Sequence, residues 1–162
     1  MQQRLHTSSS LGSGFTLLEL MLVLGLIGLL AALVQPIYVD YVQRGQQLRA
    51  QAILLSCAQR IQRLSLHQFD YLGHADSNGD GIGDADQGSL AVSACPDVDA
   101  VNVSYAFSIV AFADGFELRA IPEPSGQNVG RGALSLDHTG LRRWDTDDNG
   151  EFAADELQWS VG

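Results

Sequence analysis

The chain has 162 residues and a formal net charge of −10 at pH 7, with nineteen acidic residues, nine arginines and no lysine. This length suits one small domain on one anchor helix rather than two globular domains. The charge argues against nucleic acid as a partner, because such binding depends on neutralising phosphates with basic side chains, and it suits a divalent cation better.

A polar segment of small residues, 1–14, precedes an apolar run from Phe15 to Val34. At about 1.5 Å per residue, a helix of this length crosses a hydrocarbon core of roughly 30 Å. The run contains one charged residue, Glu19, and a carboxylate inside a membrane is costly without a partner. A secretory signal peptide has a shorter run without such a charge. A plain membrane anchor fits the length but leaves Gly14-Phe15 and Glu19 unexplained.

The apolar run opens with the motif Gly14-Phe-Thr-Leu-Leu-Glu-Leu20, and Pro36-Ile-Tyr-Val-Asp-Tyr-Val follows it. Together with the polar leader, these residues resemble the start of a type IV prepilin. The resemblance implies that a prepilin peptidase cuts between Gly14 and Phe15 and methylates Phe15. Glu19 then becomes the fifth mature residue, where its carboxylate can neutralise the α-amino group of Phe15 in the next subunit of a fibre.

The resemblance also implies an organisation, a location and partners. Residues 1–14 are the leader, 15–35 the hydrophobic transmembrane and assembly helix, and 36–162 a periplasmic or extracellular head that includes the amphipathic half of the helix. The protein is expected as a single-pass inner-membrane protein before assembly and in an extracellular pilus fibre afterwards. Its expected partners are the prepilin peptidase, other pilin subunits, the inner-membrane pilus assembly machinery and the membrane.

The distribution of arginines conflicts with this orientation. Only Arg4 precedes the apolar run, whereas Arg44, Arg49, Arg60 and Arg63 follow it. The positive-inside rule applied literally places the C-terminal side in the cytoplasm. We give precedence to the prepilin resemblance.

The pattern after Pro36 predicts a helix that continues to about Gln68 and then a sheet. Apolar residues recur at helical spacing, with three arginines on a neighbouring face; the apolar residues are Leu54, Cys57, Ala58, Ile61 and Leu64, and the arginines are Arg49, Arg60 and Arg63. Gly, Asp, Asn and Ser dominate residues 69–88, which predicts a connecting loop. Strands are expected at 101–110, 116–122 and 133–137, with a short fourth at 141–144. The expected fold is α+β, the type IV pilin fold, with one long N-terminal helix packed on a three- to four-stranded antiparallel sheet.

The C-terminal half resembles the globular part of minor pilins of the PilE type, through Cys95-Pro96, Ala120-Ile-Pro122 and the segment 132–144. Those proteins commonly carry Asp-x-Cys-Gly before the Leu-x-Leu-Asp strand, whereas this chain has Asn128-Val-Gly-Arg-Gly. The usual C-terminal disulfide is therefore not expected. Cys57 and Cys95 can form one disulfide in an oxidising compartment. A free pair is the alternative, because spacing alone does not show that their Cα atoms approach within about 7 Å.

A twelve-residue segment, 145–156, follows the pattern of an EF-hand calcium loop. Calcium prefers six to eight hard oxygens. An EF-hand loop supplies them from side chains at positions 1, 3 and 5, a backbone carbonyl at 7 and a bidentate glutamate at 12, and it has a glycine at 6. These positions are filled in order by Asp145, Asp147, Asn149, Gly150, Glu151 and Glu156. The sequence predicts a calcium site without the flanking EF-hand helices.

An earlier segment, 76–87, matches the same pattern less completely. It offers Asp76, Asn78, Asp80, the carbonyl of Ile82 and Asp84, with Gly81 at position 6. Gln87 replaces the closing glutamate, and Asp86 is the candidate substitute. A weak calcium site and a solvated, flexible loop are both open here.

The leading hypothesis is a structural, minor subunit of a type IV pilus. The nearest alternative is a pseudopilin of a type II secretion system, which shares the N-terminal chemistry. A DNA-uptake receptor pilin is disfavoured by the acidic charge, and a single-span calcium-binding anchor protein is disfavoured by Gly14-Phe15. No catalytic residues are predicted, because the histidines lie in separate segments without a nucleophile or metal-ligand pattern.

Overall fold

A computed structural model describes residues 15–99, 104–153, 155–156 and 158–159. The chain divides into two compact units, Met1–Asp40 and Tyr41–Gly162. The boundary falls within helix α1, which extends over Leu17–Gln68. Each unit is described below by itself.

Helix α1 has defined ends. At its start, the hydroxyl oxygen of Thr16 accepts a hydrogen bond from the Glu19 N–H over 3.2 Å, as an N-cap side chain does. The helix contains Pro36, which offers no N–H to the helical hydrogen-bond ladder. It ends at Gln68, as the sequence predicted, and the next residue, Phe69, has a φ of +64°.

The first unit consists mainly of the apolar part of α1. An 18-residue window near its N-terminus has a mean hydropathy of 2.7, and none of that window is buried within the structure. Large apolar side chains, among them Phe15, Leu22 and Leu33, are exposed along it. The segment is long and apolar enough to cross a membrane.

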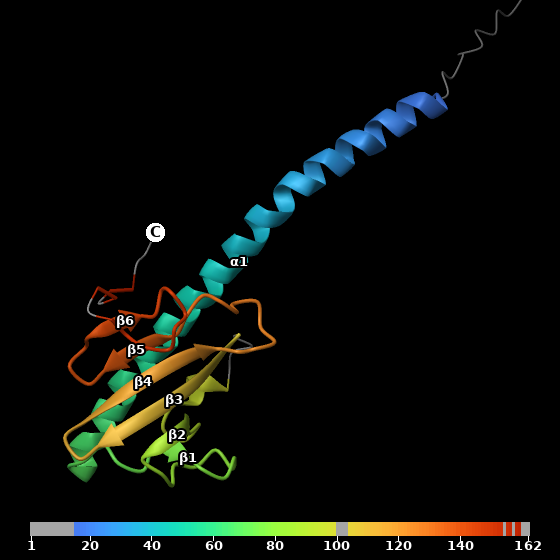
Figure 1. The fold of residues 1–162 in the computed structure, drawn as a ribbon. Coiled ribbons are helices and arrows are strands. Elements are labelled where there is room, and N and C mark those ends of the chain that lie inside the picture. The colour runs from blue at the N-terminus through green and yellow to red at the C-terminus, as the bar shows by residue number, and fades with distance from the viewer. Residues whose placement is uncertain (1–14, 100–103, 154, 157, 160–162) are drawn as a thin grey trace, which may run out of the picture. The chain divides into compact units, whose positions relative to one another are not determined.

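The second unit begins with the amphipathic half of α1, which buries one face. Leu54, Cys57, Ala58 and Ile61 are all buried, so the predicted helical repeat is confirmed for these four residues; Leu64 is half-buried. Figure 1 shows this half of α1 across one face of the sheet.

The sheet has six antiparallel strands in sequential order, β1-β2-β3-β4-β5-β6. The strands are β1 (Ala75–Asp76), β2 (Gln87–Leu90), β3 (Tyr105–Phe112), β4 (Gly115–Pro122), β5 (Leu134–Asp137) and β6 (Arg142–Trp144). β3 and β4 form the central hairpin, with pairing from Tyr105–Pro122 to Phe112–Gly115. Every second residue of β3 is buried, as expected for a sheet covered on one face.

The predicted α+β class is confirmed, but the prediction of three to four strands was wrong. β1 lies within the segment 69–88 that was predicted to be only a loop, and β2 overlaps the end of that segment. β1 has two residues, and β2 contains Gly88. β1 pairs with β2, and β2 pairs with the edge of β3. Both strands are too short and too polar to show the apolar alternation that identifies a strand in a sequence. The predicted start of the next strand, at 101–103, lies outside the described residues.

One hydrophobic core joins the helix to the sheet. Its fully buried side chains include Leu54 and Ile61 from α1, with Ile109, Phe116 and Leu118 from β3 and β4. Burying each such side chain contributes about 1.5–3 kcal/mol. The core therefore holds the amphipathic half of α1 against the sheet.

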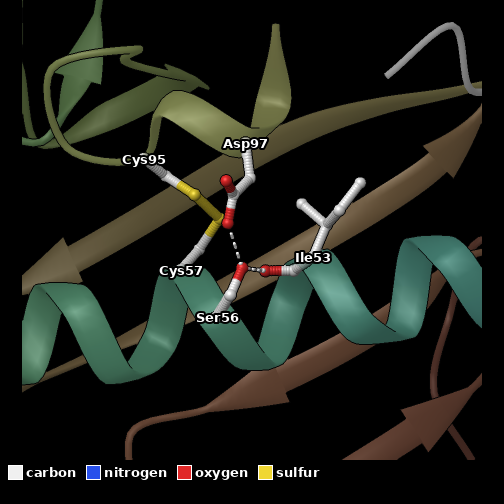
Figure 2. The surroundings of a disulfide bond; sticks show 5 residues. All are labelled: Ile53, Ser56, Cys57, Cys95 and Asp97. Carbon is white, nitrogen blue, oxygen red and sulfur yellow. Dashed lines mark hydrogen bonds between the residues drawn. A yellow bond between two sulfur atoms is a disulfide. The ribbon is translucent and has the colours of Figure 1, made fainter. Parts of the chain in front are cut away.

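A disulfide fastens α1 to the segment that precedes β3. Cys57 on α1 is bonded to Cys95, with their Cα atoms 5.2 Å apart. Cys95 directly precedes the short 3-10 helix η1 (Pro96–Val98). Beside the bond, the Ser56 hydroxyl lies 2.7 Å from Asp97 Oδ2 and 3.0 Å from the Ile53 carbonyl oxygen (Figure 2). The covalent bond and this polar contact link the same two segments.

Candidate functional site

The acidic loop 145–156 begins where β6 ends, and its first carboxylate is enclosed by the loop itself. Asp145 is only 1% exposed, and its N–H donates to the Ala133 carbonyl over 2.9 Å. The N–H groups of Asn149 and Gly150 donate to Asp145 Oδ1 and Oδ2, over 3.1 and 2.8 Å. The loop backbone thus curls around this carboxylate.

The turn that follows needs left-handed backbone at two positions. Asp148 has a φ of +56° and Gly150 a φ of +84°, which explains the glycine at position 6 of the pattern. Asn149 donates to both oxygens of Asp147, through its N–H over 3.3 Å and its side-chain amide over 2.9 Å. The Asn149 side-chain oxygen accepts from the Glu151 N–H over 2.7 Å. Asp147 is thereby held in place but remains exposed.

Glu156 returns the chain to the start of the loop. Its carboxylate accepts from the Thr146 N–H and hydroxyl, over 2.6 and 2.8 Å, and from the Ala153 N–H over 2.9 Å. The bond from Ala153, followed by those from Thr146, lowers the pKa of Glu156 below its ordinary value. The side chain is therefore anionic at neutral pH. It is also buried.

Three carboxylates meet at this point. Asp145, Asp147 and Glu156 each contribute one oxygen, and the three oxygens lie within 4.8 Å of one another. Such a cluster of hard, anionic oxygens could hold a metal ion. The other two predicted ligands of this loop are not carboxylate ligands: Asn149 would offer its amide oxygen, which accepts from the Glu151 N–H, and Glu151 its backbone carbonyl, while its side chain is exposed.

The loop is supported by a close backbone approach from the segment before β5. Gly132 has a φ of +70°, and a Cβ atom added to it would lie 1.5 Å from the Asp145 carbonyl oxygen. The indole N–H of Trp144 donates to the Arg131 carbonyl over 2.7 Å. These contacts fix the backbone from which the Asp145 side chain extends.

The earlier acidic loop uses its carboxylates differently. Asp76 accepts from the N–H groups of Gly79 and Gly81, over 2.7 and 2.8 Å, and the bond from Gly81 is the largest cause of its lowered pKa. Asp84 accepts from the Ser77 N–H and hydroxyl, both over 2.8 Å. Within the described residues, the group of carboxylates that could hold one ion is in the later loop. Calcium at 76–87 remains a prediction.

The remaining acidic groups of the earlier loop also contact local backbone. Asp80 Oδ1 accepts from the Ile82 N–H over 2.8 Å, and Asp80 Oδ2 lies 3.3 Å from the side-chain amide of Asn78. Asp86 Oδ1 accepts from the Gly73 N–H over 2.9 Å. The loop is therefore shaped by its own hydrogen bonds.

Thr146 is a part of the later site that the sequence pattern did not identify. Position 2 of the calcium pattern has no fixed residue type, yet the Thr146 side chain and N–H hold one oxygen of Glu156. A hydroxyl residue directly after the first aspartate was the available signal. Gly132 could not be found in this way, because its role depends on a contact between segments distant in sequence.

The N-terminal motif is only partly described. Gly14 lies outside the described residues, while Phe15 is 79% exposed and Glu19 lies in the first turn of α1. Cleavage and methylation remain predictions. Of the two alternatives that the sequence left open for Cys57 and Cys95, the structure has the disulfide.

A family model supports the class of protein. The model described as "Type IV minor pilin ComP, DNA uptake sequence receptor" matches residues 36–131, more than half of the chain. The match includes the amphipathic half of α1 and the segment as far as Arg131, and it ends before the loop 145–156.

Similar proteins include three named as fimbrial or pilin proteins. The type IV major fimbrial protein FimA of Dichelobacter nodosus is 35% identical over 95 residues, which is 59% of each chain. A fimbrial protein of Neisseria meningitidis serogroup B is 40% identical over 73 residues, 44% of this chain and 42% of the relative. The type IV major pilin protein PilE1 of Neisseria gonorrhoeae is 46% identical over 52 residues, 32% of this chain and 30% of the relative.

The chain thus matches less than two thirds of the length of each of these relatives. No solved structure matches it. Type IV pilins are structural subunits and not enzymes. The family match and the similar proteins together show that the chain belongs to the type IV pilin family.

Proposed function

We propose that this chain is a minor subunit of a type IV pilus. The match over residues 36–131 to a minor-pilin family carries the proposal, and the exposed apolar half of α1 supports it. In this proposal the prepilin peptidase cleaves between Gly14 and Phe15 and methylates Phe15. The apolar helix then holds the chain in the inner membrane until the assembly machinery moves it into the fibre.

Intact-mass analysis and fractionation test this proposal. The mature protein should lack residues 1–14 and carry one added methyl group. It should be present in the membrane fraction and in sheared pili. An unprocessed N-terminus would contradict the proposed processing, and exclusive association with a secretion apparatus would favour the pseudopilin alternative.

We further propose that the loop 145–156 binds calcium. Asp145, Asp147 and Glu156 bring three anionic oxygens together, which is the chemistry that calcium prefers. Asn149 and the Glu151 carbonyl are the further candidate ligands from the loop pattern. A bound calcium ion would offset repulsion among the carboxylates and hold Glu156 to the end of β6.

Thermal unfolding of the full chain in detergent tests the calcium proposal. If the site binds with a Kd on the order of 10⁻⁴ to 10⁻³ M, a tenfold excess of calcium over Kd stabilises by about 1.4 kcal/mol. The expected rise in Tm is roughly 3–6 °C. Glu156→Gln should remove most of this rise, because it removes one anionic ligand.

Glu151→Gln is the matched control, because Glu151 is predicted to contribute its backbone carbonyl and its side chain is exposed. This variant should keep the calcium response. An identical response of Glu156→Gln and wild type would show that this loop is not the site.

The description of the matching family favours DNA binding as a second candidate function. The Arg142 guanidinium carbon lies 5.2 Å from the Trp159 ring centroid, and that of Arg119 lies 5.7 Å from the Phe152 ring centroid. Arginine and aromatic side chains together form surfaces that bind nucleic acid. The net charge of −10 opposes this function.

Titration of the full chain with labelled duplex DNA tests the second candidate. Binding that weakens with salt and is lost in Arg119→Gln combined with Arg142→Gln would support it. No binding at low salt would exclude DNA binding as a function of this chain.

A further inference from the structure

Charge is divided unevenly within the second unit. Residues 41–68, the amphipathic half of α1, contain four arginines and no carboxylate. Residues 69–162 contain seventeen carboxylates and four arginines. The helix therefore presents a basic surface on an otherwise acidic head, and oppositely charged surfaces of this kind attract one another between molecules.

The basic surface of α1 also exposes large apolar side chains. We define the α1 docking face as Arg49, Arg60, Arg63, Leu48, Leu66 and Phe69. All six residues are exposed; Leu66 is 74% and Phe69 91% exposed. In the described part of the chain, no carboxylate lies within ion-pair distance of the three arginines. Exposed apolar residues among unpaired charges are typical of an interaction surface.

Phe69 is the most unusual member of this face. Its φ of +64° is in the left-handed region, which is costly for a bulky residue and is usually occupied by glycine at the end of a helix. Its N–H donates to the Ser65 carbonyl over 2.7 Å, so the conformation closes the helix. The aromatic ring nevertheless remains almost fully exposed at the helix end.

The first acidic loop has the complementary character. Asp80 and Asp84 are exposed, and between them Ile82 is 61% exposed. Hydrogen bonds from Ile82 and Ser77 hold the two carboxylates in place, so little conformational entropy is lost when a partner binds. An anionic loop with an apolar residue at its centre complements a cationic helix face with apolar residues beside it.

We propose that the α1 docking face of one copy binds the acidic loop 76–86 of a second copy of this chain. The inference rests on the proposed function as a pilus subunit, and it adds which surfaces of two subunits meet. A second copy satisfies both features of the docking face: carboxylates for the arginines and an apolar side chain for Leu66 and Phe69. DNA would satisfy the arginines alone.

Photo-cross-linking of the full chain in membranes tests the contact before any fibre forms. Phe69→p-benzoylphenylalanine keeps an aromatic group at the helix end. Irradiation should give a dimer whose cross-linked peptide contains residues 76–86. Raising the salt concentration should lower the yield, because exposed charge pairs are screened.

Charge-neutralising variants make the test specific. Arg60→Gln with Arg63→Gln should lower the dimer yield about threefold or more. Asp80→Asn with Asp84→Asn should do the same, and each asparagine keeps one of the two acceptor oxygens of the aspartate that it replaces. Asp114→Asn with Glu123→Gln, which neutralises two exposed carboxylates outside both surfaces, is the matched control and should leave the yield unchanged.

The outcomes separate this inference from the proposed function. Cross-links to DNA, to another protein only or to another part of the second copy would overturn the proposed contact. A dimer yield that is the same in the charge-neutralising variants and in wild type would also overturn it. If the chain is present in sheared pili but position 69 does not cross-link to residues 76–86, the contact is overturned and the proposed function as a pilus subunit stands. The cross-link without presence in sheared pili would support the contact and contradict the proposed function as a pilus subunit.

Discussion

Gly132 shows how one residue can determine the geometry of the acidic loop. A Cβ atom at this position would lie 1.5 Å from the Asp145 carbonyl oxygen, and the backbone φ is +70°. Gly132→Ala should therefore shift the segment that carries Asp145. We expect a loss of about 2–4 kcal/mol in the free energy of unfolding, from the clash together with left-handed strain.

Gly130→Ala is the matched control for the strain. Gly130 has a φ of +78°, but nothing lies within 4 Å of an added Cβ atom. It should cost about 1 kcal/mol, from backbone strain alone. Chemical denaturation measures both variants, and equal losses would show that the contact with Asp145 is unimportant.

Asp137 predicts a pH dependence of stability. Burial raises its pKa, but hydrogen bonds from Thr139 and Leu141 and the charge of Arg143 outweigh that effect and lower the pKa below its ordinary value of 3.8. The unfolded chain therefore binds this proton more readily than the folded chain. The stabilisation is present above about pH 4 and is lost as the pH falls through the lowered value in the folded state.

Asp137→Asn isolates this contribution. The variant keeps one acceptor oxygen for the turn but removes the charge, so it should be less stable than wild type at pH 6. The difference should shrink as the pH falls toward 3, because Asp137 of the wild type then becomes protonated and loses the contribution of its charge, whereas the other carboxylates titrate in both proteins. Denaturant unfolding at several pH values measures it, and a difference independent of pH would contradict the assignment.

At the residue scale, sequence spacing predicted the carboxylates of the acidic loop but not the residues that hold the loop in place. The positions of Asp145, Asp147 and Glu156 in a twelve-residue pattern were enough to predict that their carboxylates meet. The same spacing did not show that the Asn149 side chain would accept from Glu151. It also gave no sign of Thr146 or Gly132, because the pattern records ligands and not the groups that hold them.

At the scale of elements, α1 was predictable because its apolar repeat continues to the end of the helix. The hairpin of β3 and β4 was predictable, because strands were expected at 101–110 and 116–122 and the described parts of both ranges pair with each other. β1 and β2 were not, since their pairing is made by backbone groups in a segment rich in Gly and Asp. The disulfide could only be proposed, because its formation depends on a Cα separation that a sequence does not contain.

The Cys57–Cys95 disulfide predicts a large contribution to stability. It closes a loop with a sequence separation of 38, for which the chain-entropy model gives about 4 kcal/mol. Cys57→Ala with Cys95→Ala should lower the free energy of unfolding by about 2–4 kcal/mol and abolish any response to reductant.

Ser56→Ala is the matched control at the same junction. It removes the hydroxyl contact with Asp97 and should cost only about 0.5–1.5 kcal/mol. This variant should still respond to reductant. Urea unfolding with and without reductant distinguishes the two, and a wild-type protein insensitive to reductant would contradict the role of the disulfide.

At the scale of the whole molecule, the chain separates one exposed apolar segment from a head with its own core. Hydropathy predicted this separation. In the structure, the apolar window of the first unit is not buried, whereas the second unit buries one face of the same helix. The sequence could not show which surfaces of the head meet a neighbour. The proposed contact rests on the exposure of Phe69 and of Asp80, Ile82 and Asp84, which is known only from the folded chain.

Glu19 provides the final prediction, because two explanations of it can be separated. As the third helical residue after Thr16, it fits an N-terminal capping box, in which glutamine also serves. In a fibre, its charge would instead pair with the α-amino group of Phe15 in a neighbouring subunit. Breaking a buried ion pair costs about 3–5 kcal/mol, so Glu19→Gln and Glu19→Ala should both enter the membrane but lower incorporation into sheared pili more than tenfold. Glu151→Gln, on the head, should incorporate normally. If Glu19→Gln also does so, capping explains the residue and the charge does not.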